Sequence, residues 1–427
     1  MKVLVIGSGG REHALAWKLS KSNLVSKIFV APGNGGTDME ESIQNIDIDS
    51  NDINGLLGFA KQSHIDLTIV GPEDPLVSGI TDKFQKHGLL CFGPSKDAAR
   101  LEGSKEFMKE FLQRHKIPTA IYKTFTDSKK AISYVKEKGC PIVVKADGLA
   151  AGKGVTVAFN IDQAAEAINQ SLNSRAFGEA GSKIVIEEYL EGEEASFIVL
   201  TDGNTIIPFA SSQDHKARDD GDLGPNTGGM GAYSPAPVVT ESVHKKILNE
   251  VIYPTIEGLK SEGSDYCGFL YAGVMVDFNE NIKVLEFNCR FGDPETQPIM
   301  MRLKTDLAEL CLQACMKDLS DQDLNWDDRK SIGVVMASGG YPSDYEKGNI
   351  IEGISDESDD LKIFHAGTAY EEGNIRTNGG RVLCVTTLGE SVLLAQKKAY
   401  DAISQIKWKD CFYRNDIGYR AIEREEN

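Results

Sequence analysis

The sequence lacks any long apolar run. A helix that crosses a membrane needs about 20 consecutive apolar residues, and no stretch of the 427 residues approaches that length. The N-terminal run Met1–Ile6 stops at Gly7, which makes it too short for the apolar core of a secretory signal. We therefore expect a cytoplasmic protein that does not interact with membranes.

The sequence also lacks a basic surplus, paired histidines and an ordered cysteine spacing. Its net charge of −18 argues against a nucleic-acid partner, which needs a basic patch. None of its seven histidines has the paired spacing of a zinc site. The eight cysteines are scattered, and Cys311 and Cys315 lie one turn apart on an apolar helix face, where packing is the better explanation. We expect free thiols in a reducing compartment, without disulfides or zinc.

What the sequence does have is a repeated alternation of short apolar runs with helical segments, over a length that suits two to four domains. In residues 1–104 this alternation predicts a doubly wound parallel sheet that binds ligands at the carboxyl ends of its strands. Residues 105–325 are expected to form a second unit, with a small β-α-β-α-β lid at about 120–190. Residues 326–427 are expected to form a C-terminal α+β unit after an acidic linker. The predicted fold class is α/β.

Three glycine-containing loops follow the expected strands of the first unit, at 7–13, 32–36 and 71–75. The first opens a helix, whose N-terminus is a natural anion site. A dinucleotide is disfavoured because Glu12 stands where the third glycine of G-x-G-x-x-G belongs, and the second strand lacks the acid that holds a ribose hydroxyl. Since these loops share one rim of the sheet, we expect a phosphorylated sugar there. A purely structural turn is the alternative for the first loop.

A further glycine-rich loop follows an apolar run that delivers Lys145. It contains three glycines and a second lysine, Lys153, and it ends at Gly154. Glycine lets backbone N–H groups approach phosphate oxygens because no Cβ intervenes. The pattern is not a P-loop, since only three residues separate Gly148 from Gly152 where that motif has four. We expect a flap over a polyphosphate, most simply ATP.

Two later segments carry acids at strand ends. The first, 184–194, can place adenine contacts near Glu187 and Leu190 and ribose contacts on a following acid, although a solvated acidic turn is the favoured explanation of this segment taken alone. On the second, strand alternation puts Glu286, Asn288 and Arg290 on one face. A carboxylate and an amide oxygen suit Mg²⁺ that bridges nucleotide phosphates. The guanidinium beside them suits charge that develops on a phosphoryl or acyl oxygen.

Together these segments resemble the ATP-grasp fold, and longer motifs resemble one of its families, the phosphoribosylamine–glycine ligases or glycinamide ribonucleotide synthetases. The matching motifs are Gly-Gly-Arg-Glu-His-Ala (9–14), Ala-Pro-Gly-Asn (31–34), Leu-Glu-Gly-Ser-Lys (101–105), 145–154, Ser-Gln-Asp-His-Lys (212–216), 224–233, 286–297 and 377–382. They cover essentially the whole chain, and motifs of this length rarely recur by chance. The resemblance implies an ATP-grasp domain between the two other units.

The resemblance also implies a reaction of de novo purine biosynthesis. ATP, glycine and 5-phosphoribosylamine would give glycinamide ribonucleotide, ADP and phosphate through a glycyl phosphate. ATP would be the co-substrate, Mg²⁺ or Mn²⁺ the metal, and the two small molecules the only partners of an expected monomer.

Residue roles follow from the same resemblance. The implied nucleotide contacts are Lys105, Lys145, Gly152, Lys153, Gly154, Glu187, Leu190 and Glu194, and the implied metal ligands are Glu286 and Asn288. Arg290, Lys145 and Asp214 are the implied catalytic residues. The implied substrate contacts are Gly9, Gly10, Arg11, Gly33, Asn34, Glu73, Asp214, His215, Arg290, Asn378 and Gly380. For His215 a structural hydrogen-bonding role is an equal alternative.

The number of metal ions stays open at this point. Many ATP-grasp enzymes have another acidic ligand on the strand before the Glu-x-Asn pair, and in that register this chain has Gly273, with the nearest acid at Asp277. Two other functions also stay open. One is an ATP-grasp carboxylate–amine ligase or carboxylase that activates a different acid. The other is a nucleotide-binding regulatory protein without turnover, which the intact Lys145, Glu286 and Asn288 argue against.

Overall fold

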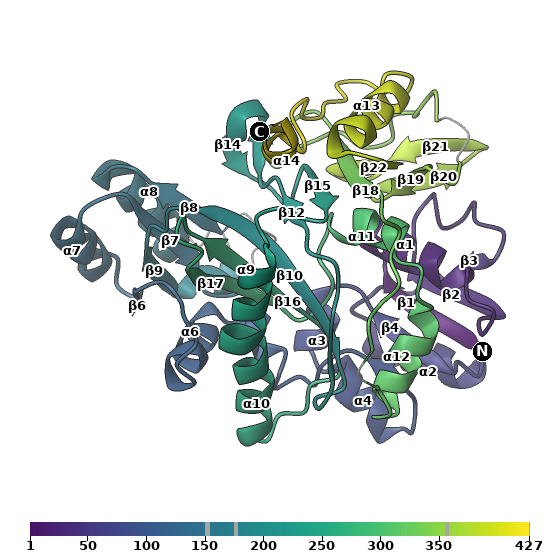
Figure 1. Cartoon of the computed structure of the whole chain (residues 1–427), viewed down its shortest axis with the longest axis horizontal. Coiled ribbons are helices and arrows are strands. Elements are labelled where there is room, and N and C mark those ends of the chain that lie inside the picture. Colours follow the sequence, from purple (N-terminus) through teal and green to yellow (C-terminus); the bar gives the residue numbers. More distant parts are fainter. Residues whose placement is uncertain (150–153, 175–177, 321, 355–357, 427) are drawn as a thin grey trace.

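The computed structural model describes residues 1–149, 154–174, 178–320, 322–354 and 358–426 (Figure 1). In this part of the chain the strands form four sheets of four or five strands and two short hairpins. The lid lies at one end of the molecule, the N-terminal sheet at the other, and the C-terminal unit spans the top of Figure 1. The α/β class with a C-terminal α+β unit is confirmed.

The N-terminal sheet is parallel, as predicted. Its strands lie in the order β3-β2-β1-β4-β5: β1 (Lys2–Gly7), β2 (Lys27–Pro32), β3 (Ile43–Asn45), β4 (Leu67–Val70) and β5 (Cys91–Phe92). The helices around it are α1 (Gly10–Ser20), α2 (Ile53–Gln62), α3 (Glu73–Val77), α4 (Ile80–Lys86) and α5 (Arg100–Gly103). Val3 and Val5 pack on one side of the sheet, and Leu4 and Ile6 on the other. Because both faces are covered, β1 is apolar throughout instead of alternating.

The lid follows α6 (Lys105–Arg114) and is an antiparallel sheet in the order β6-β9-β7-β8. Its elements are β6 (Tyr122–Phe125), α7 (Ser128–Lys138), β7 (Ile142–Ala146), β8 (Val155–Ala158), α8 (Ile161–Leu172), the 3-10 turn η1 (Gly178–Ser182) and β9 (Ile184–Glu188). The predicted β-α-β-α-β order was wrong by one strand, because β8 directly follows the glycine-rich loop and is only four residues long. This placement puts the loop between two paired strands.

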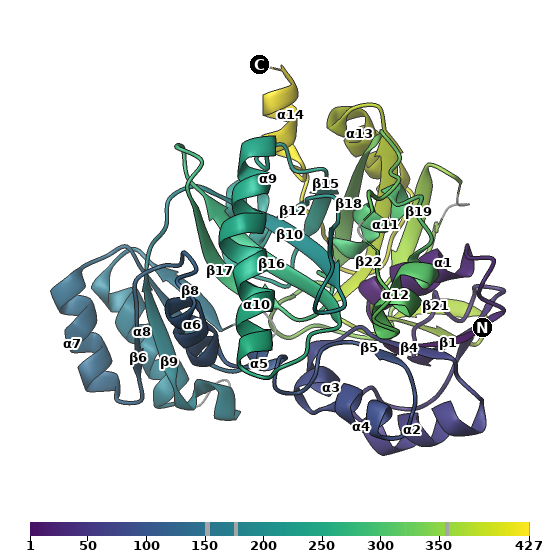
Figure 2. The ribbon, with the colours of Figure 1, turned by 60° about the horizontal axis from the view of Figure 1, so that its bottom comes forward.

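The central sheet has the order β11-β10-β16-β17 and connects the lid to the rest of the molecule. Its strands are β10 (Glu193–Thr201), β11 (Ile206–Pro208), β16 (Gly268–Val276) and β17 (Ile282–Asn288). One face is covered by α9 (Glu241–Ile247), the π-helical turn η3 (Leu248–Ile252) and α10 (Tyr253–Ser261), which form one column in Figure 2. Two further helices, α11 (Thr296–Arg302) and α12 (Leu307–Cys315), pack toward the N-terminal unit.

The C-terminal sheet is shared between two parts of the chain. Its order is β12-β15-β18-β22-β19, with β18 (Lys330–Ala337), β19 (Leu361–His365) and β22 (Arg381–Gly389) from the C-terminal unit. The strands β12 (Gln213–Asp214) and β15 (Gly231–Ser234) come from the middle of the sequence. Two hairpins, β13 (Ala217–Asp219) with β14 (Leu223–Asn226) around the turn η2 (Asp220–Asp222), and β20 (Thr368–Glu371) with β21 (Asn374–Thr377), and the helices α13 (Val392–Ile403) and α14 (Tyr419–Glu426) complete the unit.

Among the residues that the structure describes, no helix has the length and apolar character that a membrane span requires.

Candidate active site

A cavity of about 560 Å³ lies where the lid, the central sheet, the N-terminal loops and the C-terminal unit meet. Many of the residues expected from the sequence line it: Arg11, Glu73, Lys105, Lys145, Gly154, Glu187, Leu190, Glu194, Asp214, Glu286, Asn288 and Arg290. Gly152 and Lys153 lie outside the described residues. The residues expected to contact phosphate, adenine, metal and acyl phosphate therefore lie close together in one concave site.

The lid wall of the cavity contains a buried cluster of two lysines and one carboxylate. The Lys145 ammonium on β7 lies 3.1 Å from Glu187 Oε2 and donates to the Leu285 carbonyl at 3.1 Å. Lys109, which is completely buried, pairs with the same carboxylate oxygen at 3.0 Å. The other oxygen, Oε1, is buried without a hydrogen-bond partner among the described residues. A buried acceptor without a donor is costly, so this oxygen is suited to a ligand donor.

Lys105 stands at the start of α6, next to the end of β7. Ser104 caps the helix by accepting from the Phe107 N–H, and the Asp147 carboxylate accepts from the Glu106 N–H at 2.7 Å. The Lys105 ammonium donates to the Gly148 carbonyl at 3.0 Å. Burial lowers the pKa of Lys105, while the nearby Glu286 acts against that shift. A second amine is thus held at the glycine-rich loop.

Glu286 and Asn288 lie on the same face of β17, as the alternation predicted. Gly273 pairs opposite Glu286, which confirms the register expected for it, and a Cβ at Gly273 would come within 3.2 Å of Glu286 Cγ. Asp277 lies in the following turn, where its carboxylate accepts from the Asn281 N–H at 2.8 Å. Within the described ranges no group of three His, Cys, Asp or Glu side chains can hold a metal.

Lys216 is a cavity residue to which the sequence analysis gave no role. Its ammonium bonds Glu286 Oε1 at 3.0 Å and also the Glu194 carboxylate. Lys216 is the main reason that the pKa of Glu286 falls to about 2. Burial alone would lower the pKa of Lys216, but Glu194 and Glu286 raise it well above its usual value. A cation therefore already stands at the expected metal ligand.

Carboxyl groups outnumber cations on this side of the cavity. Besides Glu286 and Glu194, Asp214 and Glu295 also face Lys216, and burial raises the pKa of both. Glu295 Oε1 accepts from Ser196 Oγ at 3.0 Å, and the same hydroxyl lies 3.0 Å from the Tyr271 hydroxyl. Glu295 lies within the 286–297 motif but was given no role from the sequence, and neither was Tyr271. A pocket with surplus carboxyl groups favours an additional positive charge, such as an ammonium group.

Arg290 connects β17 to the N-terminal unit. Its Nε donates to Glu73 Oε2 at 3.2 Å and its Nη2 lies 2.8 Å from Glu102 Oε1. Burial raises the pKa of Glu102 to about 7, with Arg290 acting in the opposite direction. Burial also acts on Glu73, but Arg290 and Arg11 outweigh it and hold the pKa of Glu73 at about 2. Glu102 was not predicted, because a single acid in a short helix carries no pattern.

The residues expected in the 9–10 and 33–34 loops do not line the cavity. The Asn34 side chain accepts from the Gly36 N–H at 2.9 Å and donates to the carbonyls of Ser8 and His365, both at 2.9 Å. It connects three loops and so shapes the rim. Gly33 has a φ of +76°, where a Cβ would lie 2.1 Å from Asn45 Oδ1. Gly9 donates its N–H to Glu12 at 2.6 Å and caps α1, and a Cβ at the next residue, Gly10, would lie 2.6 Å from the Gln297 amide.

His215 also lies outside the cavity lining, with both ring nitrogens engaged. Its Nε2 accepts the Gly418 N–H at 3.2 Å, so Nδ1 carries the proton and faces the Gly231 carbonyl at 3.3 Å. Burial lowers the pKa of His215 to about 4, and Arg414 adds to this shift. The ring is therefore neutral at pH 7 and connects two backbone segments.

Asn378 and Gly380 were expected to contact substrate from the C-terminal unit. Neither lines the cavity, although other residues of that unit do. Asn378 is exposed, and a Cβ at Gly380 would lie 2.3 Å from the Tyr341 ring. The residues of the C-terminal unit that do line the cavity are Tyr341, Tyr345 and Arg381. Arg381 Nη1 donates to the carbonyls of Gly228 and Asp293, both at 2.7 Å, which fastens the polar 213–233 segment to the C-terminal unit.

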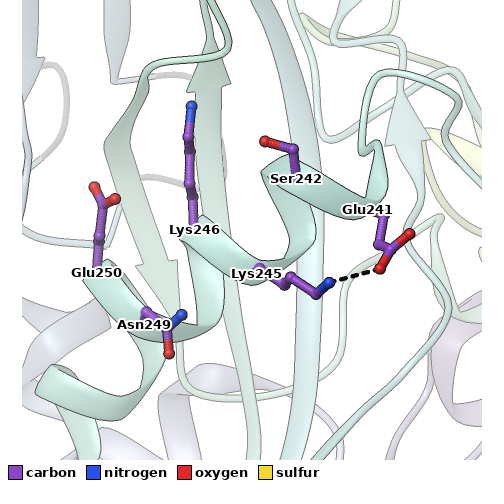
Figure 3. A pocket seen from close by; sticks show the side chains of 6 residues that line it. All are labelled: Glu241, Ser242, Lys245, Lys246, Asn249 and Glu250. Carbon is purple, nitrogen blue, oxygen red and sulfur yellow. Dashed lines mark hydrogen bonds and ion pairs between the residues drawn. The ribbon is translucent and has the colours of Figure 1, made fainter.

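A separate hollow lies on the outer face of α9 and η3 (Figure 3). It is lined by Glu241, Ser242, Lys245, Lys246, Asn249 and Glu250. These side chains come from one helical stretch, and Lys245 already pairs with Glu241 at 2.6 Å. Nothing converges on this hollow from another element, so it is not a candidate active site.

Three family models match the chain in order. They are the phosphoribosylglycinamide synthetase N domain at residues 1–102, its ATP-grasp (A) domain at 103–296 and its C domain at 331–420. A curated relative, phosphoribosylamine–glycine ligase of Vibrio vulnificus (strain CMCP6), is 60% identical over 427 residues and covers all of both chains.

Two solved structures resemble the whole molecule. Phosphoribosylamine–glycine ligase of Thermotoga maritima superposes with a TM-score of 0.84 at 31% identity, over 98% of this chain and 100% of that one. The biotin carboxylase domain of the Hydrogenobacter thermophilus 2-oxoglutarate carboxylase, in complex with MgADP and bicarbonate, superposes with a TM-score of 0.74 at 15% identity, over 96% and 91%. The second likeness concerns the fold alone.

Proposed function

The chain belongs to the phosphoribosylglycinamide synthetase family and is an ATP-grasp ligase of purine biosynthesis, and we propose how the residues of its cavity divide the work. We infer that the acid substrate is glycine and the amine substrate is 5-phosphoribosylamine. The observation that carries this proposal is that phosphate-binding lysines, metal-type oxygens and a surplus of carboxyl groups line one cavity.

The nucleotide lies along the lid in this proposal. Glu187 and Leu190 contact adenine, Glu194 contacts the ribose, and Lys105 and Lys145 contact the phosphates with Gly154 and the residues before it. The buried Glu187 Oε1, which has no partner among the described residues, suits the exocyclic amine of adenine. Lys105 begins α6 and Lys145 stands near the end of β7, close to it, so both ammonium groups can neutralise phosphate charge.

Glu286 and Asn288 fit a divalent cation, Mg²⁺ or Mn²⁺. Their oxygens are hard donors on one strand face, and the Lys216 ammonium on Glu286 is a stand-in for positive charge at that point. When bound, the cation neutralises phosphate charge. The absence of a further acid on β16 supports a site that nucleotide oxygens complete.

The first chemical step activates a carboxylate. A glycine carboxylate oxygen attacks the γ-phosphorus of ATP in line, the bond to the bridging oxygen breaks, and ADP leaves with the electron pair. Arg290 stabilises the charge on the acyl phosphate, and Lys145 stabilises the charge on the transferring group. Asp214 holds the glycine ammonium together with Glu295, which the surplus of carboxyl groups around them supports.

The second step forms the amide. The amine nitrogen of phosphoribosylamine attacks the acyl carbon, the acyl carbon–oxygen bond breaks, and the nitrogen loses a proton to the departing phosphate. Arg11 and Glu73 lie beside Arg290 at the N-terminal loops and orient the sugar phosphate. Gly9, Gly10, Gly33, Asn34, Asn378, Gly380 and His215 shape the surrounding loops without lining the cavity. The activated acid must be shielded from water, which a closing lid achieves.

The test is ADP release from Mg-ATP with glycine and freshly generated phosphoribosylamine. We expect turnover only with both substrates and glycinamide ribonucleotide as the product, while alanine or bicarbonate in place of glycine releases no ADP. Turnover with a different acid would replace glycine in the proposal. Tight nucleotide binding without turnover under any of these conditions would contradict catalysis by this site.

We further propose that the protein acts as a monomer in the cytoplasm. The cysteines at the eight positions are free thiols, which suits a reducing compartment. Sedimentation at micromolar concentration would test the first point, and a single species near 46.6 kDa is expected.

A further inference from the structure

The last part of the chain lies against the segment that carries Lys216. In Figure 1, α14 is next to β14, far from it in sequence. From the contacts between them we propose that the segment 414–418 positions Lys216 in the active site, with Arg414 as the positioning residue. This inference rests on the proposed role of the cavity, and it adds a function for the C-terminal segment that the reaction itself does not require.

Arg414 holds the residue that follows Lys216. Its side chain is completely buried, and its Nη1 donates to the Ala217 carbonyl at 3.1 Å and to Asp222 Oδ1 at 2.8 Å. Its Nε and Nη2 form a bidentate pair with Asp416 at 2.7 and 2.8 Å. A bidentate guanidinium fixes geometry as well as charge. Arg414 thus ties both ends of the β13–η2 stretch to the C-terminal segment.

His215, the residue that precedes Lys216, is itself held by the C-terminal segment. Its ring accepts the Gly418 N–H at 3.2 Å. On the cavity side, the Lys216 carbonyl accepts from the Thr227 N–H at 2.8 Å. Lys216 is therefore flanked by two contacts to the C-terminal segment and one contact to the opposing strand of the hairpin.

The segment 414–418 is itself fixed to α13. The Tyr400 hydroxyl donates to the Arg414 carbonyl at 2.8 Å and accepts the Ile417 N–H at 3.2 Å. Gln396 donates to the Ile417 carbonyl at 2.8 Å. Contacts thus run from α13 through the buried Arg414, Ile417 and Gly418 to the residues on both sides of Lys216, and through them α13 can fix the backbone there.

Position matters at Lys216 because its ammonium lies between two carboxylates. A lysine side chain has four rotatable bonds, and only a fixed backbone keeps its nitrogen between Glu194 and Glu286. A misplacement of about 1 Å in an active site can cost a factor of about 100 in rate. Loss of the Arg414 contact to Ala217 would release the backbone at that point.

The experiment is a double-mutant cycle between Arg414→Gln and Lys216→Ala. We expect Lys216→Ala to lower kcat about 100-fold and Arg414→Gln to lower it about 10-fold or more. If Arg414 acts through Lys216, the kcat of the double variant lies within about a factor of 2 of the kcat of Lys216→Ala. If the two effects are independent, the losses in kcat multiply. Nucleotide affinity, measured by calorimetry with a nonhydrolysable ATP analogue, separates positioning from a collapsed site.

Asp222→Asn gives a second, gentler variant. Asp222 has a φ of +58°, a conformation that asparagine also adopts readily, so the substitution removes a charge facing Arg414 and keeps the backbone. We expect a smaller fall in kcat, about 3-fold, that again disappears in the Lys216→Ala background. Lys409→Gln, which breaks an exposed pair with Glu346 just before the segment, is the matched control and keeps normal kcat.

The outcomes are distinguishable. Multiplicative losses in the double variant, or normal kcat in Asp222→Asn and Arg414→Gln, overturn the positioning role. If Arg414→Gln does not fold, as judged by circular dichroism, the Asp222→Asn cycle decides the question. Normal turnover in Lys216→Ala would overturn this inference while leaving the proposed function intact. Absence of glycine-dependent turnover in the unmodified protein would overturn the proposed function instead.

Discussion

At the scale of single residues, the cavity contains charges that pair with each other before any ligand is bound. Lys145 pairs with Glu187, Lys216 with Glu286, and Arg290 with Glu73. Ligand phosphates that bind Lys145 and Arg290, as we propose, would take the place of these protein carboxylates. Such exchange keeps each charge compensated, which avoids the cost of a buried unpaired ion.

Lys145→Met tests the charge of that lysine with little change in side-chain volume. We expect kcat/KM for ATP to fall about 100-fold or more, because one phosphate-facing cation is lost in a water-poor site. The measurement is steady-state ADP release over a range of ATP concentrations. Lys123→Met removes an exposed lysine from the same lid and serves as the control. Equal kinetics in the two variants would contradict the assigned role.

The residues that sequence reasoning identified share a local pattern. Lys145 stands before a glycine loop, and Glu286 and Asn288 alternate on one strand, so local spacing singled out each segment and the family resemblance joined them in one site. Lys216, Glu295 and Tyr271 were not identified, because only the sheet that joins distant segments brings them together. Residue type alone cannot show where a side chain points.

Asn34 and His215 were expected to contact substrate on the basis of their motifs. In the structure their polar atoms are used by neighbouring backbone groups instead. Both residues have the right chemistry for a ligand, and both satisfy loop segments that would otherwise leave buried N–H and C=O groups unpaired. Burial and partners, which no motif contains, decide between these two uses.

At the scale of elements, β9, β10 and the connection between them carry the residues that we propose contact adenine and ribose. Gly192 in this connection has a φ of +148°, and a Cβ there would lie 2.3 Å from the Val276 carbonyl of β16. A side chain at this position must displace one strand of the central sheet. The geometry of Leu190 and Glu194 therefore depends on a glycine.

Gly192→Ala should weaken nucleotide binding about 10-fold and lower stability by about 2 kcal/mol, since strained backbone and a clash with a carbonyl add together. Calorimetric titration with an ATP analogue and urea unfolding measure the two effects. Gly88→Ala is the matched control, because Gly88 also has a positive φ of +72° but no atom within 4 Å of its added Cβ. Nucleotide affinity equal to that of the control would contradict this role of Gly192.

Elements were predictable where they are long and apolar. β1, β4 and α2 match the alternation expected for the first unit, and β16 and β17 match the later pair. Short strands such as β8 and β12 were missed because two to four residues carry too little periodicity. β12 in particular pairs with β15 in a sheet whose other three strands, β18, β19 and β22, come more than a hundred residues later.

At the scale of the whole molecule, His215 couples pH to stability at the contact between the middle and C-terminal segments. Its pKa falls from about 6.5 to about 4 on folding, so the unfolded chain binds more protons between these values. Its stabilising contribution is therefore complete above pH 6.5 and is lost as the pH falls toward 4. Arg414 and Arg420 face the ring and oppose its protonation, while Asp222 favours it.

We predict that His215→Gln is less stable than the unmodified protein at pH 7.5, and that the difference shrinks by about 2 kcal/mol at pH 5. Urea unfolding of both proteins at the two pH values measures this change. Comparing the two proteins isolates His215, because buried acids such as Glu102, whose raised pKa acts in the opposite direction, contribute equally to both. A pH-independent difference would show that the ring is not neutral and buried.

The ion pair between Lys216 and Glu286 predicts how the stability of the whole protein responds to a chelator. Lys216 compensates the charge of Glu286 without a metal, so we expect the protein without added ligands to need no metal for stability. EDTA should leave its Tm unchanged. Mg-ATP at 100 times its dissociation constant should add about 2.7 kcal/mol of stability, and EDTA should remove most of that gain, because Glu286 and Asn288 would hold the cation and the cation would neutralise phosphate charge. Thermal melts with and without each additive test this, and Glu286→Gln should lose the magnesium-dependent part alone. A fall in Tm on adding EDTA to the ligand-free protein would instead reveal a structural metal.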